Sequence, residues 1–291
     1  MAVRITIANH KGGVAKSTTA MMLADGLALR GHRVLVFDLD PQGMVSRLLL
    51  GRSGVASAVR QEKTIGHLLE KLISGKPAQL ARYQTPGSDL AELREPNALG
   101  RVDVVASDDR TLVVELARLE DALRALASGE RLDVLLWRLL EPQLAKHDRN
   151  YDVVIFDTPA GTPPLALTAL RLSTHVIAPT NLEENSFSTL MVFLRIVLAD
   201  ELGLAGTVRV HVLPTMFLAS NPEQVRFLDY IRTSTPEVNA FPRPIPHTVA
   251  IHRAEAHPGP GAFRRSREKY DSAISDVQAL AEAVEQRIIK R

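Results

Sequence analysis

The sequence predicts an α/β fold in which a doubly wound, mostly parallel central sheet is flanked by helices. Three short apolar runs, "VRITIAN" (3–9), "RVLVFDLD" (33–40) and "YDVVIFDTP" (151–159), end in polar or turn residues, as strands buried on both faces of a parallel sheet do. A glycine-rich loop and a segment with helical spacing separate the first two runs. Strand, loop, helix and strand in this order form a βαβ unit, whose crossover we expect to be right-handed.

The other elements continue this alternation. The first helix is predicted over "KSTTAMMLADGLALRGH" (16–32), with Gly31 at its end. A helix, a strand and a further helix follow residue 180, and a final amphipathic helix begins near Ser266. The segment at about 52–150 reads as a helical elaboration that also contains a Pro- and Gly-rich loop and one short strand, "VDVVAS". Within this segment we expect helices at 64–74, 110–128 and 132–147 and a strand at 102–107. Further strands are expected at 174–180 and 208–215.

Length and composition favour a single domain over 1–291, because open α/β sheets reach this size around one core. The apolar and charged fractions, 45% and 23%, are those of ordinary globular proteins. No cysteine is present, which excludes disulfides, thiolate zinc sites, cysteine-ligated iron–sulfur clusters and a cysteine nucleophile. We find no signal-peptide pattern and no apolar stretch of the ~18 to 20 residues that span a bilayer, so we expect a cytoplasmic protein.

The loop "HKGGVAKSTT" (10–19) has the chemistry that a polyphosphate needs. Gly12 and Gly13 let the backbone approach phosphates at a helix N-terminus, and Lys16 can lie along the β- and γ-phosphates. Ser17, which opens the helix, can place its hydroxyl on Mg²⁺. Taken alone, the loop is also compatible with an ordinary βα turn that carries exposed lysines.

Three carboxylates reinforce the interpretation as a phosphate site. Asp38 and Asp40 in "FDLDPQG" and Asp157 in "VVIFDTPAG" lie at the C-terminal ends of predicted strands, where open α/β sheets bind ligands. Asp157 is suitably placed to hold a magnesium-bound water, as a Walker B aspartate does. Each carboxylate alone is compatible with a helix cap. Three of them around one lysine-glycine loop favour a nucleotide site.

These motifs together carry a family resemblance. "KGGVAKST", "DLDPQG" and "YDVVIFDTPAG", in this order, resemble the ParA/MinD family of deviant Walker A ATPases, whose loop reads K-G-G-x-x-K-[ST]. A weaker likeness continues through "HVIAPTNLEENSFSTL", "LPTM" and "IPHTVAIHRAEA". The resemblance implies a P-loop NTPase fold, ATP and Mg²⁺ as ligands, and slow, partner-stimulated hydrolysis to ADP and phosphate.

The resemblance also implies a role for each residue. Lys16 matches the P-loop lysine, and Lys11 the signature lysine that crosses an ATP-sandwiched homodimer to the partner's nucleotide. Asp40 matches the aspartate that orients the attacking water, while Ser17, Asp38 and Asp157 surround the metal. The implied nucleotide contacts are Lys11, Gly12, Gly13, Val14, Ala15, Lys16, Ser17 and Thr18 around the phosphates and Thr215, Met216 and Pro246 around the adenine.

Ala15 departs from the family pattern, which has glycine at this place. An alanine suits the loop if its φ is negative, since only a positive φ favours glycine. Its backbone N–H stays available for a phosphate. We expect alanine in place of glycine at position 15 to affect the affinity for nucleotide.

Within the family, the sequence most resembles partition ATPases without an N-terminal helix-turn-helix domain, because the loop begins about ten residues from Met1. The resemblance implies an ATP-dependent homodimer that binds nonspecific DNA on the nucleoid, segregates or positions a DNA or protein cargo, and is stimulated by a ParB-like adaptor or cargo protein. Net charge is only +2, so DNA contact requires a local basic patch. The predicted patch, for which a solvated helix start is the alternative, comprises Arg243, Arg253, Arg264, Arg265, Arg267 and Lys269.

Two other functions compete with partition. A MinD-like positioning ATPase would use a C-terminal amphipathic helix on a membrane, but in "DVQALAEAVEQRIIKR" the apolar face is largely Ala, Val and Leu, so we expect this helix to pack on the domain and no membrane partner. A small-molecule ATP-dependent synthetase of the same fold would need polar substrate anchors, and we identify none. His247, His252 and His257 are five apart, a spacing that does not align ligands on one helix face, so zinc is not expected.

Overall fold

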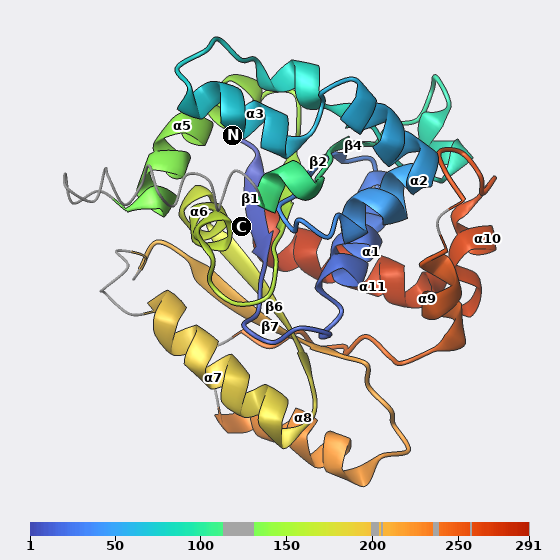
Figure 1. The fold of residues 1–291 in the computed structure, drawn as a ribbon. Helices are drawn as coiled ribbons and strands as arrows, with labels where there is room; N and C mark the ends of the chain where they lie inside the picture. The colour runs from blue at the N-terminus through green and yellow to red at the C-terminus, as the bar shows by residue number, and fades with distance from the viewer. Residues whose placement is uncertain (113–130, 199–203, 205, 235–238, 257, 291) are drawn as a thin grey trace.

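The computed structural model describes residues 1–112, 131–198, 204, 206–234, 239–256 and 258–290. Within these residues, strands form a seven-stranded sheet in the order β3-β4-β2-β5-β1-β6-β7 (Figure 1). All neighbours pair in parallel except β3, which runs antiparallel to β4 at one edge. The strands are β1 (Val3–Ile7), β2 (Arg33–Asp38), β3 (Thr85–Pro86), β4 (Arg101–Val105), β5 (Val153–Asp157), β6 (His175–Asn181) and β7 (Arg209–Thr215).

Helices cover both faces of the sheet, which confirms the predicted doubly wound α/β class (Figure 1). Alternate side chains of β2 and β5 enter different cores: Val34 and Val36 face one helical layer, whereas Leu35 and Phe37 face the other. The helices are α1 (Lys16–Leu29), α2 (Met44–Arg60), α3 (Ile65–Ile73), α5 (Leu132–His147), α6 (Pro164–Leu172), α7 (Glu184–Leu198), α8 (Pro222–Ser234), α9 (Val249–Ala254), α10 (Ser266–Tyr270) and α11 (Ile274–Val284).

Three apolar cores hold these layers together. One lies under α1, α2, α9 and α11, and the second lies under α3, α5 and α6 on the opposite face. The third core joins α7 and α8 to β6 and β7, and Figure 1 shows this helix pair at one end of the sheet. Each core buries mainly Leu, Ile, Val and Phe, and burial of this kind of side chain stabilises the fold by about 1.5–3 kcal/mol per residue.

The segment at about 52–150 is more than a helical elaboration. Its predicted strand is β4, which pairs with β2 inside the central sheet. The helices predicted at 64–74 and 132–147 are α3 and α5. Most of the helix predicted at 110–128 lies outside the described residues. The segment is therefore part of the domain core.

The C-terminal helix begins near Ser266 as predicted but is interrupted. α10 ends at Tyr270, because the following Asp271 adopts a positive φ of 46°, and α11 starts at Ile274. α11 packs closely on α1: a Cβ built on Gly26 would lie 2.9 Å from the Cβ of Ala281. This contact explains the glycine within α1 and confirms that the C-terminal apolar face packs on the domain. None of the helices in the described part of the chain has the length and apolar character needed to cross a membrane.

Candidate functional site

The carboxyl ends of three adjacent strands meet at one edge of the sheet. Asp38 at the end of β2 and Ile7 at the end of β1 both pair in register with Asp157 at the end of β5. The glycine-rich loop leaves β1 at this edge and opens α1. The sequence therefore brings the loop and the acidic strand ends together through strand register, as expected for parallel strands with buried apolar interiors.

A cavity of about 810 Å³ lies over this edge. The loop, the segment after β2 and the end of α9 form its walls. Of the predicted nucleotide-site residues it brings together Gly12, Gly13, Ala15, Lys16, Ser17, Thr18, Asp40 and Met216. Arg253, predicted for the DNA surface, also lines it, and the residues not predicted are Gln42, Met44, Ala160, His252, Glu255 and Ala256. Lys11 is not among the described residues that line it.

Lys16 is held inside the loop. Its side chain is almost fully buried, and Nζ donates a hydrogen bond to the carbonyl oxygen of Lys11 over 3.1 Å. Burial lowers the pKa of Lys16, while Asp157 and Asp40 oppose this change. A cation in this position, surrounded by carboxylates and next to the N-terminus of α1, is suited to a polyphosphate ligand.

Asp38 is fully buried and organises the segment that carries Asp40. One of its oxygens accepts hydrogen bonds from the N–H and Oγ of Ser46, over 2.8 and 2.6 Å, and the other accepts from the N–H of Asp40 over 3.1 Å. Burial raises the pKa of Asp38 to about 7, even though the Ser46 hydrogen bonds lower it. Asp40 is half-buried at the cavity wall, where its carboxylate also accepts from the N–H of Gln42.

Asp157 has the properties expected of a group that interacts with a metal. Its carboxylate is fully buried, and neither oxygen has a hydrogen-bond partner among the described residues. Burial raises its pKa well above the usual range, and the neighbouring Asp38 raises it further. The Ser17 hydroxyl lowers the pKa from nearby without completing a hydrogen bond of normal geometry. Unpartnered carboxylate oxygens beside a hydroxyl are a donor set that fits Mg²⁺.

Ala15 does not adopt the negative φ that would suit an alanine. Its φ is 63° and its ψ is 36°, in the left-handed region, and Gly13 two residues earlier has a φ of 70°. The loop must reverse direction between β1 and α1, and this reversal places position 15 where glycine is favoured. The loop geometry therefore accommodates alanine at a conformational cost.

We expect Ala15→Gly to raise the free energy of unfolding by about 0.5–1 kcal/mol, because glycine adopts the left-handed region without the Cβ penalty. Gly13→Ala provides the matched control, since an added Cβ there meets nothing within 4 Å. It should lower the same free energy by about 1–2 kcal/mol through backbone strain alone. Urea unfolding of the nucleotide-free proteins measures both changes. Equal stabilities of wild type and Ala15→Gly would contradict the strain at position 15.

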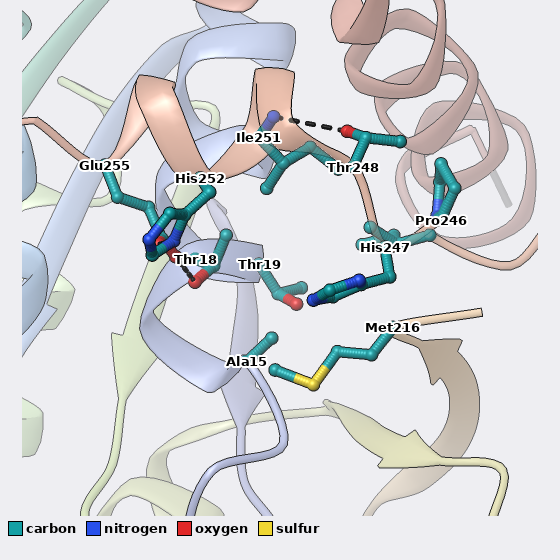
Figure 2. Close-up of a pocket in the computed structure, with 11 residues that line it drawn as sticks. Ala15, Thr18, Thr19, Met216, Pro246, His247, Thr248, Ile251, His252 and Glu255 are labelled. Carbon is teal, nitrogen blue, oxygen red and sulfur yellow. Dashed lines mark hydrogen bonds and ion pairs between the residues drawn. The ribbon is translucent and has the colours of Figure 1, made fainter. Parts of the chain in front are cut away.

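A smaller cavity of about 80 Å³ continues from the loop (Figure 2). Met216 and Pro246, predicted to border the adenine, both line it beside Ala15. Thr215 lies behind this surface: it is buried, and its hydroxyl donates to the carbonyl of Val14 over 3.2 Å. The structure thus places Val14 and Thr215 as supports of the loop, whereas Met216 and Pro246 form the wall.

Sequence reasoning missed one side of this cavity. Thr18 donates a hydrogen bond to Glu255 over 2.5 Å, and His252 Nδ1 lies 3.0 Å from the same carboxylate (Figure 2). The residues belong to α1 and to the end of α9, more than 230 positions apart in the sequence. The sequence feature that could have revealed this wall is the pair His252 and Glu255, because a spacing of three places two polar side chains on one helix face.

The predicted basic patch is only partly present. Lys269 is buried: Nζ donates to Asp25 and Asp89 over 2.8 and 2.7 Å, so it belongs to a buried ion cluster and not to a surface. Burial lowers the pKa of Lys269, but the two carboxylates raise it by more. Of the other predicted members, Arg243 forms an ion pair with Asp276. Arg253 lines the cavity. The remaining three are exposed: Arg264, Arg265 and Arg267.

Comparison with known proteins identifies the family. The AAA domain profile matches residues 2–199. The chromosome-partitioning ATPase Soj of Thermus thermophilus is 34% identical over 180 residues, which are 62% of this chain and 55% of that protein. The chain belongs to the AAA domain family, within its ParA/MinD group of ATPases. The matched segment spans about half the length of this relative, and also about half the length of the chromosome partitioning protein ParA of Myxococcus xanthus.

Two solved structures have a fold similar to that of this chain. The Cyanothece McdA–ATP complex aligns with a TM-score of 0.69 at 18% identity, over 98% of this chain and 95% of that one. Cobyrinic acid a,c-diamide synthase from Mycobacterium smegmatis, with a bound ATP analog and magnesium, gives 0.66 at 23% identity, over 88% and 94%. At these identities the likeness shows the fold alone.

Proposed function

We propose that the chain is an ATP-dependent partition ATPase that dimerises around ATP, binds DNA without sequence preference in that state, and is stimulated by a ParB-like partner to hydrolyse ATP and release. The observation that carries this proposal is the placement of the two lysines. Lys16 lies buried at the phosphate loop, whereas Lys11 lies outside the cavity. A site with its own lysine inside and a second lysine outside is suited to completion by another copy.

The residues around the cavity support hydrolysis as the chemistry. Lys16 and the loop backbone would hold the β- and γ-phosphates, and Met216 and Pro246 the adenine. Asp40, half-buried at the wall, would orient the attacking water. Mg²⁺, held by Ser17 with Asp157 behind it, would supply charge neutralisation on the phosphate oxygens. The buried Asp38 would act through the segment that it fixes.

For the DNA surface we retain Arg264, Arg265 and Arg267, which lie exposed on and before α10. Exposed guanidinium groups bind phosphates without reading base edges, and the affinity falls steeply with salt. Lys269 is excluded because its ammonium is already paired on both sides.

We expect the double charge reversal Arg264→Glu and Arg265→Glu to lower ATP-dependent DNA affinity by about tenfold or more and to flatten its salt dependence. A matched control reverses two exposed charges on α7 and α8, Arg195→Glu and Arg226→Glu, at the same change in net charge. Gel shifts with ATP and with ADP at several salt concentrations measure the effect. The assignment fails if both double variants bind DNA equally well.

Neither competing function gains support from a particular contact. The apolar face of α11 is buried against α1, which leaves it unavailable for a MinD-like membrane contact. The likeness to the diamide synthase extends to the fold alone. Slow hydrolysis accelerated by DNA and an adaptor would support partition, whereas turnover that requires a small acid substrate would support a synthetase.

A further inference from the structure

A buried ion cluster joins α1 to the segment 263–270, the arginine segment, which carries the three exposed arginines. The Lys269 ammonium at the end of this segment pairs with Asp25 of α1 and with Asp89. The hydroxyl of Tyr270 also donates a hydrogen bond to Asp25, over 2.6 Å. All four side chains are buried. One ammonium therefore ties together three parts of the chain that are distant in the sequence.

The residues that attach the arginine segment to the domain recur every three positions. The backbone of Phe263 forms a parallel bridge with that of Leu90. The N–H of Ser266 donates to a carboxylate oxygen of Glu92 over 2.5 Å, and Lys269 is the third attachment. The arginines occupy positions between these attachments and are exposed. Their arrangement on the surface therefore depends on how firmly the segment is held from below.

The backbone is strained on both sides of the ion cluster. Ser88, which precedes Asp89, has a φ of 80°, and Asp271, which follows Tyr270, has a φ of 46°. Positive φ favours glycine, so both residues adopt costly conformations. Such conformations persist only where the surrounding contacts hold them. The cluster supplies such contacts, and Oγ of Ser88 also donates to Asp25 over 3.4 Å.

Net stability does not explain the cluster well. It contains two carboxylates and one ammonium, and one oxygen of Asp89 has no hydrogen-bond partner among the described residues. Burial raises the pKa of Asp89 to about 6, even though Lys269 lowers it. Removing charges from water is costly, and apolar residues of similar volume often stabilise a protein as much as a buried ion pair does. The cluster is better explained by the place that it gives to the arginine segment.

We propose that Lys269 is a positioning residue, which through Asp25 and Asp89 holds the exposed arginines in one arrangement for contact with DNA phosphates. The inference rests on the proposed DNA surface, whose members are Arg264, Arg265 and Arg267. Lys269 cannot touch DNA itself, because its side chain is fully buried. Asp25 belongs to α1, so the arginine segment is attached to the helix that the phosphate loop opens.

The anchoring is tested in nucleotide-free protein by hydrogen exchange with mass spectrometry. We expect Lys269→Met to accelerate exchange of the amides at 263–268 by about tenfold relative to those of β7, because the segment opens more often without its third attachment. Arg4→Met is the matched control. Arg4 is also a buried cation between two carboxylates, Glu141 and Asp148, but it pairs with α5 and its C-terminal end on the opposite face of the sheet. The control should leave the ratio unchanged, and an unchanged ratio in Lys269→Met would overturn the anchoring.

A neutral variant keeps the test valid if Lys269→Met alone does not fold. Asp25→Asn, Asp89→Asn and Lys269→Met together remove all three charges, so no unpaired charge of the cluster is left buried. We expect this triple variant to exchange its amides at 263–268 about threefold to tenfold faster than wild type, again relative to β7. Exchange at the wild-type rate in the triple variant would overturn the role of the ion cluster.

The consequence is tested by gel shifts with ATP. Lys269→Met, or the triple variant in its place, should lower DNA affinity by about threefold to tenfold and make its salt dependence shallower. The affinity for nucleotide should stay within about twofold of wild type, because the described residues that line the cavity do not include Asp25, Asp89 or Lys269. Faster exchange with unchanged DNA affinity would overturn the positioning role.

A double-variant comparison tests whether Lys269 acts through the arginines. In a protein that already carries Arg264→Glu and Arg265→Glu, Lys269→Met should lower DNA affinity by less than about twofold, because the effects of coupled residues do not add. The same loss in both backgrounds would contradict the role. A wild-type protein that does not bind DNA would overturn the proposed DNA surface and this role with it. Hydrogen exchange would still report the anchoring, so the two failures are distinguishable.

Discussion

Lys11→Ala is expected to abolish ATP-dependent dimerisation while leaving nucleotide binding by the single chain within about twofold of wild type. Lys11 does not line its own cavity, and its ammonium contacts only the start of α7 among the described residues. Its removal therefore takes nothing from the nucleotide bound in cis. It removes the cation that, by our proposal, would reach the partner's phosphates.

Lys16→Ala is the matched control for this prediction. Lys16 is buried at the loop and lines the cavity, so its loss should weaken nucleotide binding itself by about 100-fold or more. Binding is measured with a fluorescent ATP analogue, and association by sedimentation. If Lys11→Ala loses nucleotide affinity to the same degree as Lys16→Ala, the two lysines act together in one chain and the proposed dimer role is wrong.

The sequence predicted the strands and acidic strand ends because their signals are local. A buried parallel strand is a continuous apolar run, and the register of β2 with β5 then places Asp38 beside Asp157 without further information. The phosphate loop is equally local. Its placement at the end of β1 required only that the strand and α1 be recognised.

The errors lie where distant contacts decide the outcome. Lys269 stands in a basic run of the sequence, but Asp25 and Asp89, 244 and 180 positions away, determine that it is buried. The backbone conformation of Ala15 depends on how β1 and α1 are joined, which the residue type alone does not reveal. The cavity wall at Glu255 depends in the same way on α9 reaching Thr18.

The second large effect is expected for Asp157→Asn. This substitution should stabilise the nucleotide-free protein and reduce the stability that the protein gains from Mg²⁺ and an ATP analogue. Asp157 is fully buried with two unpartnered oxygens, so its ionised form is costly in the absence of a cation. Asparagine keeps the shape without the charge, and we expect about 1–3 kcal/mol of added stability at pH 8. Wild type gains stability from Mg²⁺ and an ATP analogue by ligand binding, and the variant should lose most of that gain.

The pH dependence of this effect has a definite sign. Burial raises the pKa of Asp157, so the folded protein keeps this proton at a pH where the unfolded chain has lost it. The corresponding stability is fully present below the ordinary carboxyl pKa near 4 and is lost as the pH rises from there through the raised pKa of Asp157 in the folded protein. Asp157→Asn should therefore match wild type near pH 4 and exceed it increasingly toward pH 8.

Asp152→Asn gives the opposite control for the same urea experiment. Hydrogen bonding to Arg33 lowers the pKa of Asp152, so its contribution is present above the ordinary carboxyl pKa and is lost as the pH falls through the folded value. That variant should be less stable than wild type at pH 8, with a difference that shrinks in acid. If Asp157→Asn also destabilises the nucleotide-free protein at pH 8, the ionised carboxylate is satisfied in the folded protein, and the assignment of an unpartnered metal-site aspartate is wrong.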